Sequence, residues 1–157
     1  ENKMIEETEK HIQRVGYYLT IFINQITKRA LNHDKSKLEE PEKSIFEKFT
    51  PLLKNCTYGS EEYQQFLKEM KPALDHHYSN NRHHPEFHKD RIKGMTLIDL
   101  IELIADFKAA SERHENGDVY KSIEISQKRF GYSDELKQIL INTVNEMIEI
   151  SNKIEGK

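Results

Sequence analysis

The chain holds a single cysteine, Cys56, among its 157 residues. One cysteine excludes a disulfide framework and any metal site built from several cysteines, and it suits a reducing cytosol. No apolar run approaches the twenty residues that a membrane span needs. No charged-then-apolar leader opens the chain either, so we expect no signal peptide. We therefore expect a cytoplasmic protein without a membrane segment.

Neither sign of charge dominates the sequence. It has 24 lysine and arginine residues against 27 aspartate and glutamate residues, for a formal net charge of -3. A general nucleic-acid binder needs a basic face, so this balance argues against that class. Gly/Ser linkers, repeats and low-complexity tracts are also missing. We expect one domain over residues 1–157, which at this length can bury roughly 70% of its unfolded surface without a disulfide or structural zinc.

No segment shows the convincing alternation of apolar and polar residues that is typical of a strand. The spacing of apolar residues predicts helix almost throughout the chain. The first helix should run from about residue 3 to about residue 31. It carries a stripe of residues at alternating steps of three and four, which we expect to be a buried face. The stripe consists of Ile5, Thr8, Ile12, Val15, Leu19, Phe22 and Ile26.

Several later helix starts are marked by residues that cap helices or suit a first turn. They are Pro41, Ser60, Thr96, Asp118 and Ser133. Thr96 is the strongest of these signals, because Asp99 follows at capping-box spacing. We expect the third helix to meet Pro72 and residues 79–94 to be irregular. The strongly apolar helix that follows Thr96 should end at Gly117. The prediction is an all-α domain of five to seven helices.

Histidine is plentiful: there are eight, and five of them lie between His76 and His88. The imidazole nitrogen is the commonest protein donor to transition metals. Five imidazoles with two amides and a carboxylate in so short a segment are hard to explain by packing. The alternative is an exposed polar loop that is histidine-rich by chance. The segment lacks the cysteines of a zinc finger and the spacing of the His-Glu-x-x-His proteases.

Three further places could supply metal ligands. The His33-Asp34 pair offers a nitrogen and an anionic oxygen to one ion, or it is only a helix-end turn. His11 either enters the bundle core from the first helix or is half-buried with a local hydrogen bond. Asp106 lies in the most apolar helix, where a narrow acidic stripe can present a carboxylate to an internal metal. The alternative for Asp106 is a solvated acid–base ladder from Glu102 to Arg113.

The order of these residues resembles the order of ligands in the HD superfamily of metal-dependent phosphohydrolases. That order is an early histidine, His33-Asp34 with Lys37 after it, a His-rich segment, and then Asp106. The sequence is still more similar to a family of unknown function found in bacteria and phages, over about His11 to Tyr132. This closer similarity is carried by the strings HDKSKL, ALDHHYSNNRHHPEFH, GMTLIDLIELIADFKAASERH and SIEISQKRFG.

The resemblance implies an HD-like helical domain with one or two divalent metal ions. The first site would consist of His11, His33, Asp34 and Asp106. A second ion would take His77 and His84, with His76 and His83 as close alternatives. We expect the loop from His76 to His88 to fold over the His33-Asp34 pair. Oxygen and imidazole ligands suit Mn, Fe, Co, Ni or Zn.

The resemblance also implies hydrolysis of a phosphomonoester or phosphodiester, on a nucleotide or a similar small phosphorylated molecule. A metal-bound hydroxide would attack phosphorus, with Asp34 as the ligand able to bridge two ions. Lys37 would neutralise charge on the phosphoryl oxygens, and Asn81 and Arg82 would also bind substrate. His83 would protonate the leaving oxygen.

Two functions without catalysis stay open beside this one. The first is a helical protein that binds a metal or a nucleotide and has lost turnover. The second is a phage-encoded interaction protein whose His-rich loop contacts a host partner. An oligomer is compatible with any of the three.

Overall fold

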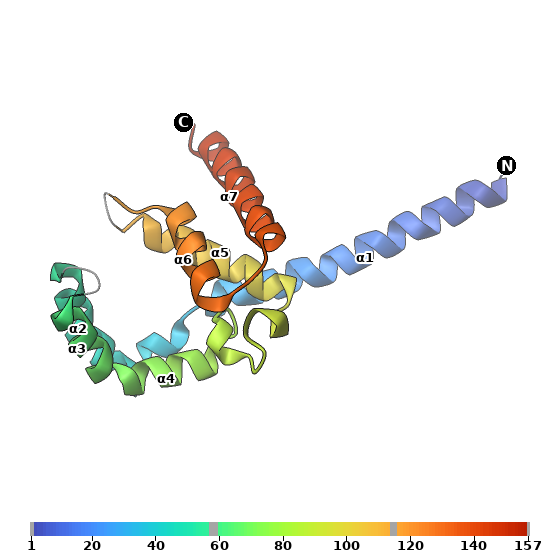
Figure 1. The fold of residues 1–157 in the computed structure, drawn as a ribbon. Helices are drawn as coiled ribbons and strands as arrows, with labels where there is room; N and C mark the ends of the chain where they lie inside the picture. The colour runs from blue at the N-terminus through green and yellow to red at the C-terminus, as the bar shows by residue number, and fades with distance from the viewer. Residues whose placement is uncertain (1, 57–59, 114–115, 157) are drawn as a thin grey trace.

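The computed structural model describes residues 2–56, 60–113 and 116–156, and it confirms the predicted all-α class (Figure 1). These residues form seven α-helices and three short 3-10 helices, and no strand occurs among them. The α-helices are α1 (Asn2–Asn32), α2 (Glu42–Asn55), α3 (Glu61–Glu69), α4 (Lys71–Asn80), α5 (Leu97–Ser111), α6 (Val119–Phe130) and α7 (Asp134–Glu155). The 3-10 helices are η1 (Lys35–Leu38), η2 (Pro85–Phe87) and η3 (Arg91–Gly94).

Four predicted helix starts are confirmed by their capping hydrogen bonds. The side chains of Ser60, Asp118 and Ser133 accept backbone N–H groups from the first turns of α3, α6 and α7. Thr96 and Asp99 form both hydrogen bonds of a capping box at the start of α5. Each cap satisfies N–H groups that a helix start leaves without an intrahelical partner.

Three other predicted features are wrong. Pro72 does not end a helix, because it lies in the first turn of α4, where a missing N–H is not needed. Helix α4 continues to Asn80, so the first two histidines of the His-rich segment lie on a helix and not in a loop. The helix that was expected to end at Gly117 ends earlier, at Ser111.

Two apolar clusters hold the helices together. The larger joins α5, α6 and α7, and its buried members are Ile104, Val119, Ile123, Tyr132, Leu140 and Val144. The smaller lies where α2, α3 and α4 pack together, and it buries Phe49, Met70 and Ala73. Between these clusters lie the end of α1, the end of α4 and the middle of α5, which together position the candidate site.

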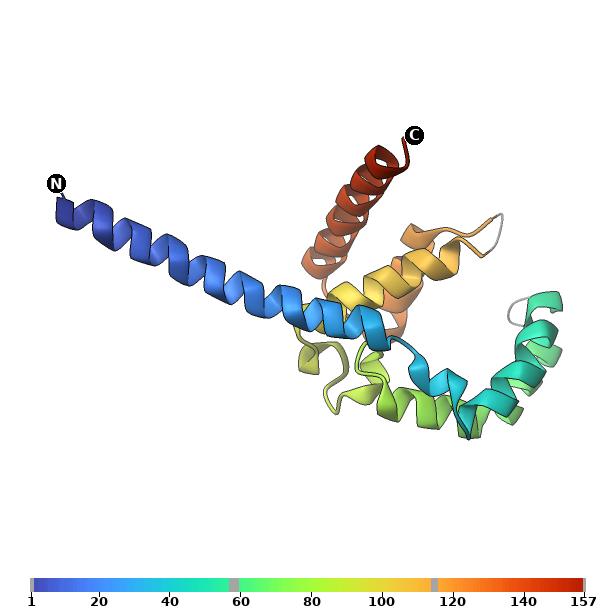
Figure 2. The same cartoon turned by 180° about the vertical axis from the view of Figure 1, so that it is seen from behind.

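Helix α1 departs most from expectation. Only its last turns lie beside α5, and the rest extends away from the other helices (Figures 1 and 2). The stripe that was predicted to be buried is open along this extension, with Ile12 62%, Leu19 54% and Phe22 51% exposed. Even so, within the described ranges no helix combines the length and the apolar character that crossing a bilayer requires.

Candidate metal centre

Segments far apart in the sequence bring histidines and aspartates to one place. The end of α1, the last turn of α4, the turn that follows α4, and the middle of α5 each contribute. The residues are His33, Asp34, His77, His83, His84 and Asp106. They include five of the six predicted ligands, together with His83, and the His-rich segment does fold over the His33-Asp34 pair.

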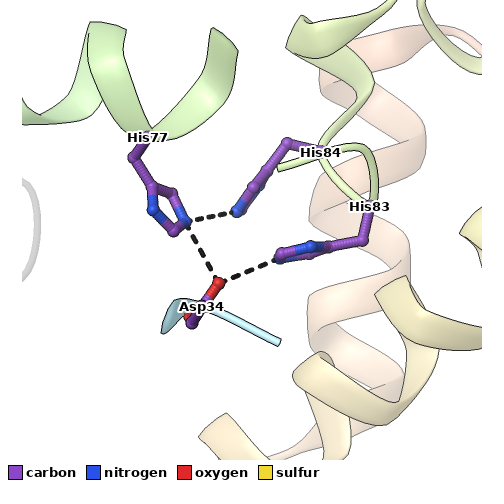
Figure 3. A group of neighbouring side chains, drawn as sticks. All are labelled: Asp34, His77, His83 and His84. Carbon is purple, nitrogen blue, oxygen red and sulfur yellow. Dashed lines mark hydrogen bonds and ion pairs between the residues drawn. The ribbon is translucent and has the colours of Figure 1, made fainter. Parts of the chain in front are cut away.

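Asp34 lies at the centre of the group, between α1 and η1. Its backbone is left-handed, with φ 53° and ψ 18°. A non-glycine residue in this region is uncommon, although aspartate tolerates it better than most. Strain of this kind concentrates at functional sites. Asp34 Oδ1 lies 3.3 Å from His77 Nε2 and 3.5 Å from His83 Nε2 (Figure 3).

The first set of candidate ligands is Asp34, His77, His83 and His84, whose ligand atoms all lie within 4.8 Å of one another. The closest pair is His77 Nε2 and His84 Nε2, at 2.9 Å. Two nitrogens that bind one ion at right angles, each at about 2.1 Å, are about 3 Å apart. The spacing of the two imidazoles therefore matches that of neighbouring ligands on a single ion.

A second set adjoins the first and consists of His33, His83 and Asp106. His33 Nε2 lies 3.7 Å from Asp106 Oδ1 and 3.6 Å from Asp34 Oδ2. His83 Nε2 lies 3.7 Å from Asp106 Oδ2. Because a single Nε2 binds one ion at a time, His83 can serve only one of the two sets. Asp34, with one oxygen toward each set, is the residue able to serve both.

Carboxylates behind the imidazoles set the direction of the rings. Glu102 Oε1 lies 3.0 Å from His33 Nδ1 and 3.3 Å from His83 Nδ1. Glu42, which is fully buried, places Oε2 2.8 Å from His77 Nδ1. An imidazole that donates its Nδ1–H to a carboxylate keeps a lone pair on Nε2, which here faces the centre. This carboxylate–histidine arrangement is typical of metal ligands.

A charged clamp holds Glu102 in turn. Arg29 donates to Glu102 Oε2 at 2.8 Å and to Asp99 Oδ1 at 2.8 Å, which joins α1 to α5. Asp99 is fully buried and also accepts from Arg82. Burial alone would raise the pKa of Asp99, but hydrogen bonds from Arg82, Thr96 and Arg29 lower it to about 2. The clamp therefore stays ionised at neutral pH.

Two atoms at the centre of the group are left without partners. Asp34 Oδ1 and His83 Nε2 are buried and have no hydrogen-bond partner. A buried polar atom without a partner costs about 1–3 kcal/mol, and such atoms are rare in native proteins. A cation between the two would pair both of them. The residues present therefore fit a divalent metal ion.

The protonation states at the site suit a cation as well. Burial alone would raise the pKa of Asp34, but the facing His77 imidazole and the Lys37 ammonium hold it below its usual range. Burial, with the neighbouring imidazoles, lowers the pKa of His84 to about 3, so that ring is neutral. The Asp106 and Glu102 carboxylates raise the pKa of His33 to about 10. The negative charge that attracts a proton to His33 also attracts a metal ion, and the ion displaces that proton when it binds.

The structure corrects the prediction that His11 is a ligand of this site. His11 is exposed and lies 22 positions before His33. Because an α-helix rises 1.5 Å per residue, the two residues are roughly 33 Å apart along α1. Helix α1 is continuous over residues 2–32, so no bend returns His11 to the group.

Three residues predicted to contact substrate already have partners in the protein. Lys37 Nζ donates to Asp34 Oδ2 at 2.6 Å. Asn81 Nδ2 donates to the backbone carbonyl of His77 at 2.8 Å, so Asn81 positions a candidate ligand. Arg82 donates to buried Asp99, although its side chain remains 46% exposed. Of the three, Lys37 lies nearest to the candidate ligands.

His83 also takes a different place from the one predicted. Its ring is 1% exposed, and its Nε2 belongs to both candidate ligand sets. A buried imidazole that faces two aspartates is better placed to bind a metal than to meet a leaving group from solvent. His76, the other close alternative, lies outside both sets and places its Nδ1 2.7 Å from Glu42 Oε1.

Sequence reasoning missed the carboxylates behind the histidines. Glu102 had a usable signal, because it lies four residues before Asp106 on the same helical face. For Asp99 the sequence indicated only a role in capping a helix. Its hydrogen bonds from Arg29 and Arg82 were not predicted. Glu42 had none, since its contact with His77 joins residues 35 positions apart.

Comparison with curated proteins finds no match to this chain, and comparison with solved structures finds none either. One family model does match, over residues 1–150, and its description reads "Family of unknown function (DUF5662)". The match takes in every candidate ligand and all but the last residues of α7. The chain belongs to this family of unknown function.

Proposed function

We propose that the protein is a metal-dependent phosphohydrolase that acts on a nucleotide or a similar small phosphorylated molecule. The observation that carries the proposal is the convergence of Asp34, His77, His83 and His84, with two buried ligand atoms lacking any other partner. A divalent ion held there would lower the pKa of a bound water and polarise a phosphoryl oxygen. Oxygen and imidazole donors suit Mn, Fe, Co, Ni or Zn.

The spatial grouping supports an HD-superfamily relationship. The His33-Asp34 pair, the His-rich segment and Asp106 occur in the order expected of that superfamily, and they lie together in space. The early histidine is the departure, because His11 lies far along α1. His83 takes part in the group instead. The same proposal places the protein in the cytoplasm, where the single Cys56 stays reduced.

The chain's own residues would divide the work. Glu102 and Glu42 hold the imidazoles with Nε2 toward the centre. Lys37 is 35% exposed, and its ammonium lies beside the Asp34 carboxylate. From there Lys37 can contact a phosphoryl oxygen that approaches the ligands and neutralise charge as it develops. Lys37 cannot itself be a ligand while charged, since an ammonium has no lone pair.

A cavity that reaches the candidate site through Phe46 supports a substrate of nucleotide size. Its volume is about 810 Å³, within the range of small-molecule sites. Phe46 and Lys54 of α2 and Arg113 after α5 are among the residues that line it. Phe46 also adjoins the candidate ligands, because its ring centroid lies 5.9 Å from that of His77 and 5.2 Å from Lys37 Nζ. Aromatic faces stack on bases, and cations pair with phosphates.

The burial of the histidines favours chemistry inside the protein over docking to a host partner. A docking loop would turn its imidazoles outward. Here His77 is 2% exposed and His83 1% exposed. A metal-binding protein without turnover remains the alternative, and the same assay separates it from the enzyme.

The proposal is tested with protein that is stripped by a chelator and reloaded separately with each of the five metals. Each form is then assayed for phosphate release, or for ring opening of cyclic nucleotides, against a panel of nucleotides. We expect metal-dependent turnover of at least one substrate, lost in Asp34→Asn and kept in Asp75→Asn. Asp75 is the matched control, because it is an exposed aspartate on the same helix as His77. Bound metal without turnover across the panel would instead support a non-catalytic protein.

We expect Lys37→Met to separate substrate contact from metal binding. Methionine keeps an apolar stem against Phe46 but removes the ammonium. Turnover should fall about 100-fold, the usual cost of losing one group that stabilises charge in a transition state. Metal content, measured by elemental analysis, should stay within about twofold of wild type, because the ligands are intact. Loss of metal together with activity would show that Lys37 supports Asp34 and has no role toward substrate.

A further inference from the structure

The N-terminal part of α1 exposes as much apolar surface as the largest patches that monomers carry. We call residues 4–23 the arm. Its exposed apolar residues are Met4, Ile5, Ile12, Val15, Tyr17, Tyr18, Leu19, Ile21, Phe22 and Ile23. The three aromatic rings, each about half exposed, leave roughly 300 Å² open, and the aliphatic side chains roughly double that area. The largest apolar patch of a typical monomer is about 300–600 Å².

The arm has only exposed side-chain pairs, such as Glu6 with Lys10 and Arg14 with Tyr18, to support its helix from within. Gly16 lies in its middle, and it is rich in β-branched residues such as Ile12, Val15 and Ile21, which are poor helix formers. In water most helical stability in proteins comes from packing of an apolar face rather than from helix propensity. A continuous helix over residues 2–32 therefore calls for a partner along the arm.

The spacing of the stripe indicates that the partner is another helix. From Ile5 to Ile26 the positions step by 3, 4, 3, 4, 3 and 4 residues, an average of 3.5. This heptad spacing is the one that keeps an apolar seam facing a neighbouring helix. Within the described parts of the chain, no other segment lies against the seam before its end at α5 (Figure 2).

The seam ends in a groove that is otherwise open. A cavity of about 250 Å³ lies between the end of α1 and α5. Its apolar lining comes from Ile26, Ala30, Ile98, Ile101, Ala105 and Ala109. Ile26 is both the last residue of the seam and part of this α1/α5 groove, so the two apolar surfaces are continuous.

We infer that the arm of one chain lies antiparallel along α1 of a second copy and fills the α1/α5 groove of that copy. The arm is at one end of the seam and the groove is at the other. Two copies related by a two-fold axis therefore cover the arm and the groove of both chains at once. The assembly is then a closed dimer, with no arm or groove left for a third copy. Two helices in contact along the seam and the groove would bury an area comparable to the roughly 800 Å² per partner that a stable dimer buries. A parallel pairing would join arm to arm and leave both grooves open.

The antiparallel seam has a definite register. In an antiparallel pair, a residue at one heptad position of the seam faces a residue at the other heptad position in the second copy. Leu19 then lies opposite Phe22 of the second copy, and Val15 lies opposite its Ile26. In that register the two copies of Ile5 are 31 residues apart along the axis, or roughly 47 Å. In a parallel pair they would be adjacent.

The first test measures the mass of the full chain in solution by light scattering over a range of concentrations. We expect twice the 18.6 kDa of one chain. Leu19→Glu and Ile12→Glu should each weaken the dimer at least tenfold. Ile139→Glu, on α7, should not, although Ile139 is 57% exposed and so matches Leu19 at 54%. A wild-type monomer, a larger assembly, or dimers unaffected by both arm substitutions would overturn the inference.

The second test distinguishes the two pairings. Ile101→Glu alters the groove, which His33, Glu102 and Asp106 also line, and leaves the arm unchanged. It should weaken the dimer if the arm occupies that groove. In a Cys56→Ser background, Ile5→Cys should give no disulfide-linked dimer on oxidation. A high yield of that disulfide would show parallel arms, and an unchanged dimer in Ile101→Glu would refute occupation of the groove. Neither readout depends on metal or turnover, so these results are independent of the proposed hydrolase function.

Discussion

Asp34→Asn is expected to abolish metal binding by the protein. Asparagine has nearly the size of aspartate and also tolerates a left-handed backbone, so the turn between α1 and η1 should survive. It replaces one carboxylate oxygen of the first candidate ligand set, and of the group that adjoins the second, by a neutral amide. Metal copurifying with the variant, measured by elemental analysis, should fall to less than about a tenth of the wild-type amount.

Thermal melting gives an independent readout of the same change. A ligand present at 100 times its Kd stabilises the folded state by about 2.7 kcal/mol, or roughly 5–10 °C in Tm for a chain of this size. Chelator should therefore lower the Tm of the wild type and leave that of Asp34→Asn unchanged. Asp75→Asn should respond as the wild type does. If the wild-type Tm ignores both chelator and added metal, and no metal copurifies, the site does not bind metal.

Glu102→Gln is expected to weaken metal binding without removing any candidate ligand. One oxygen of Glu102 faces both His33 and His83, and the other accepts from Arg29. Burial alone would raise the pKa of Glu102, but hydrogen bonds from His33, His83 and Arg29 lower it, so the group is a carboxylate at neutral pH. A glutamine must turn its NH2 toward one of these donors. Loss of such a supporting carboxylate usually costs 10–100-fold in metal affinity, so we expect about that reduction.

The same substitution should also destabilise the chelated protein by about 1–3 kcal/mol, because it leaves donors near Glu102 unpaired. Calorimetric titration measures the affinity, and urea unfolding in chelator measures the stability. Glu112→Gln is the matched control, because Glu112 follows the end of the same helix and its side chain is 64% exposed. An affinity for metal within about twofold of wild type would show that the histidines need no support from Glu102.

Local sequence signals predicted the helices well, because the groups that cap a helix lie within a few residues of its end. Ser60, Thr96, Asp118 and Ser133 each act on backbone N–H groups two or three positions later. Pro72 was misread because its local effect is ambiguous. The same missing N–H that ends one helix is harmless in the first turn of the next.

The candidate site was partly accessible from residue types. Imidazoles and carboxylates in this number indicate a metal, and His33, Asp34, His77, His84 and Asp106 do lie together. The choice between adjacent histidines was not accessible. His76 and His77 both contact Glu42, yet only His77 also reaches Asp34. Neighbouring residues on a helix point about 100° apart, so the turn of α4 relative to η1 decides which one faces the centre.

Helix α1 shows where local information ends. The amino-acid order alone is enough to specify a long helix with an apolar seam, because periodicity is a property of consecutive residues. Whether that seam is covered depends on which distant segments reach it. Only the packing of α5 against the last turns of α1 shows that Ile26 borders a groove while Ile12 and Leu19 are open. The same packing carries His33 to Asp106 and leaves His11 outside, since a rigid helix cannot bring both of its ends to one site.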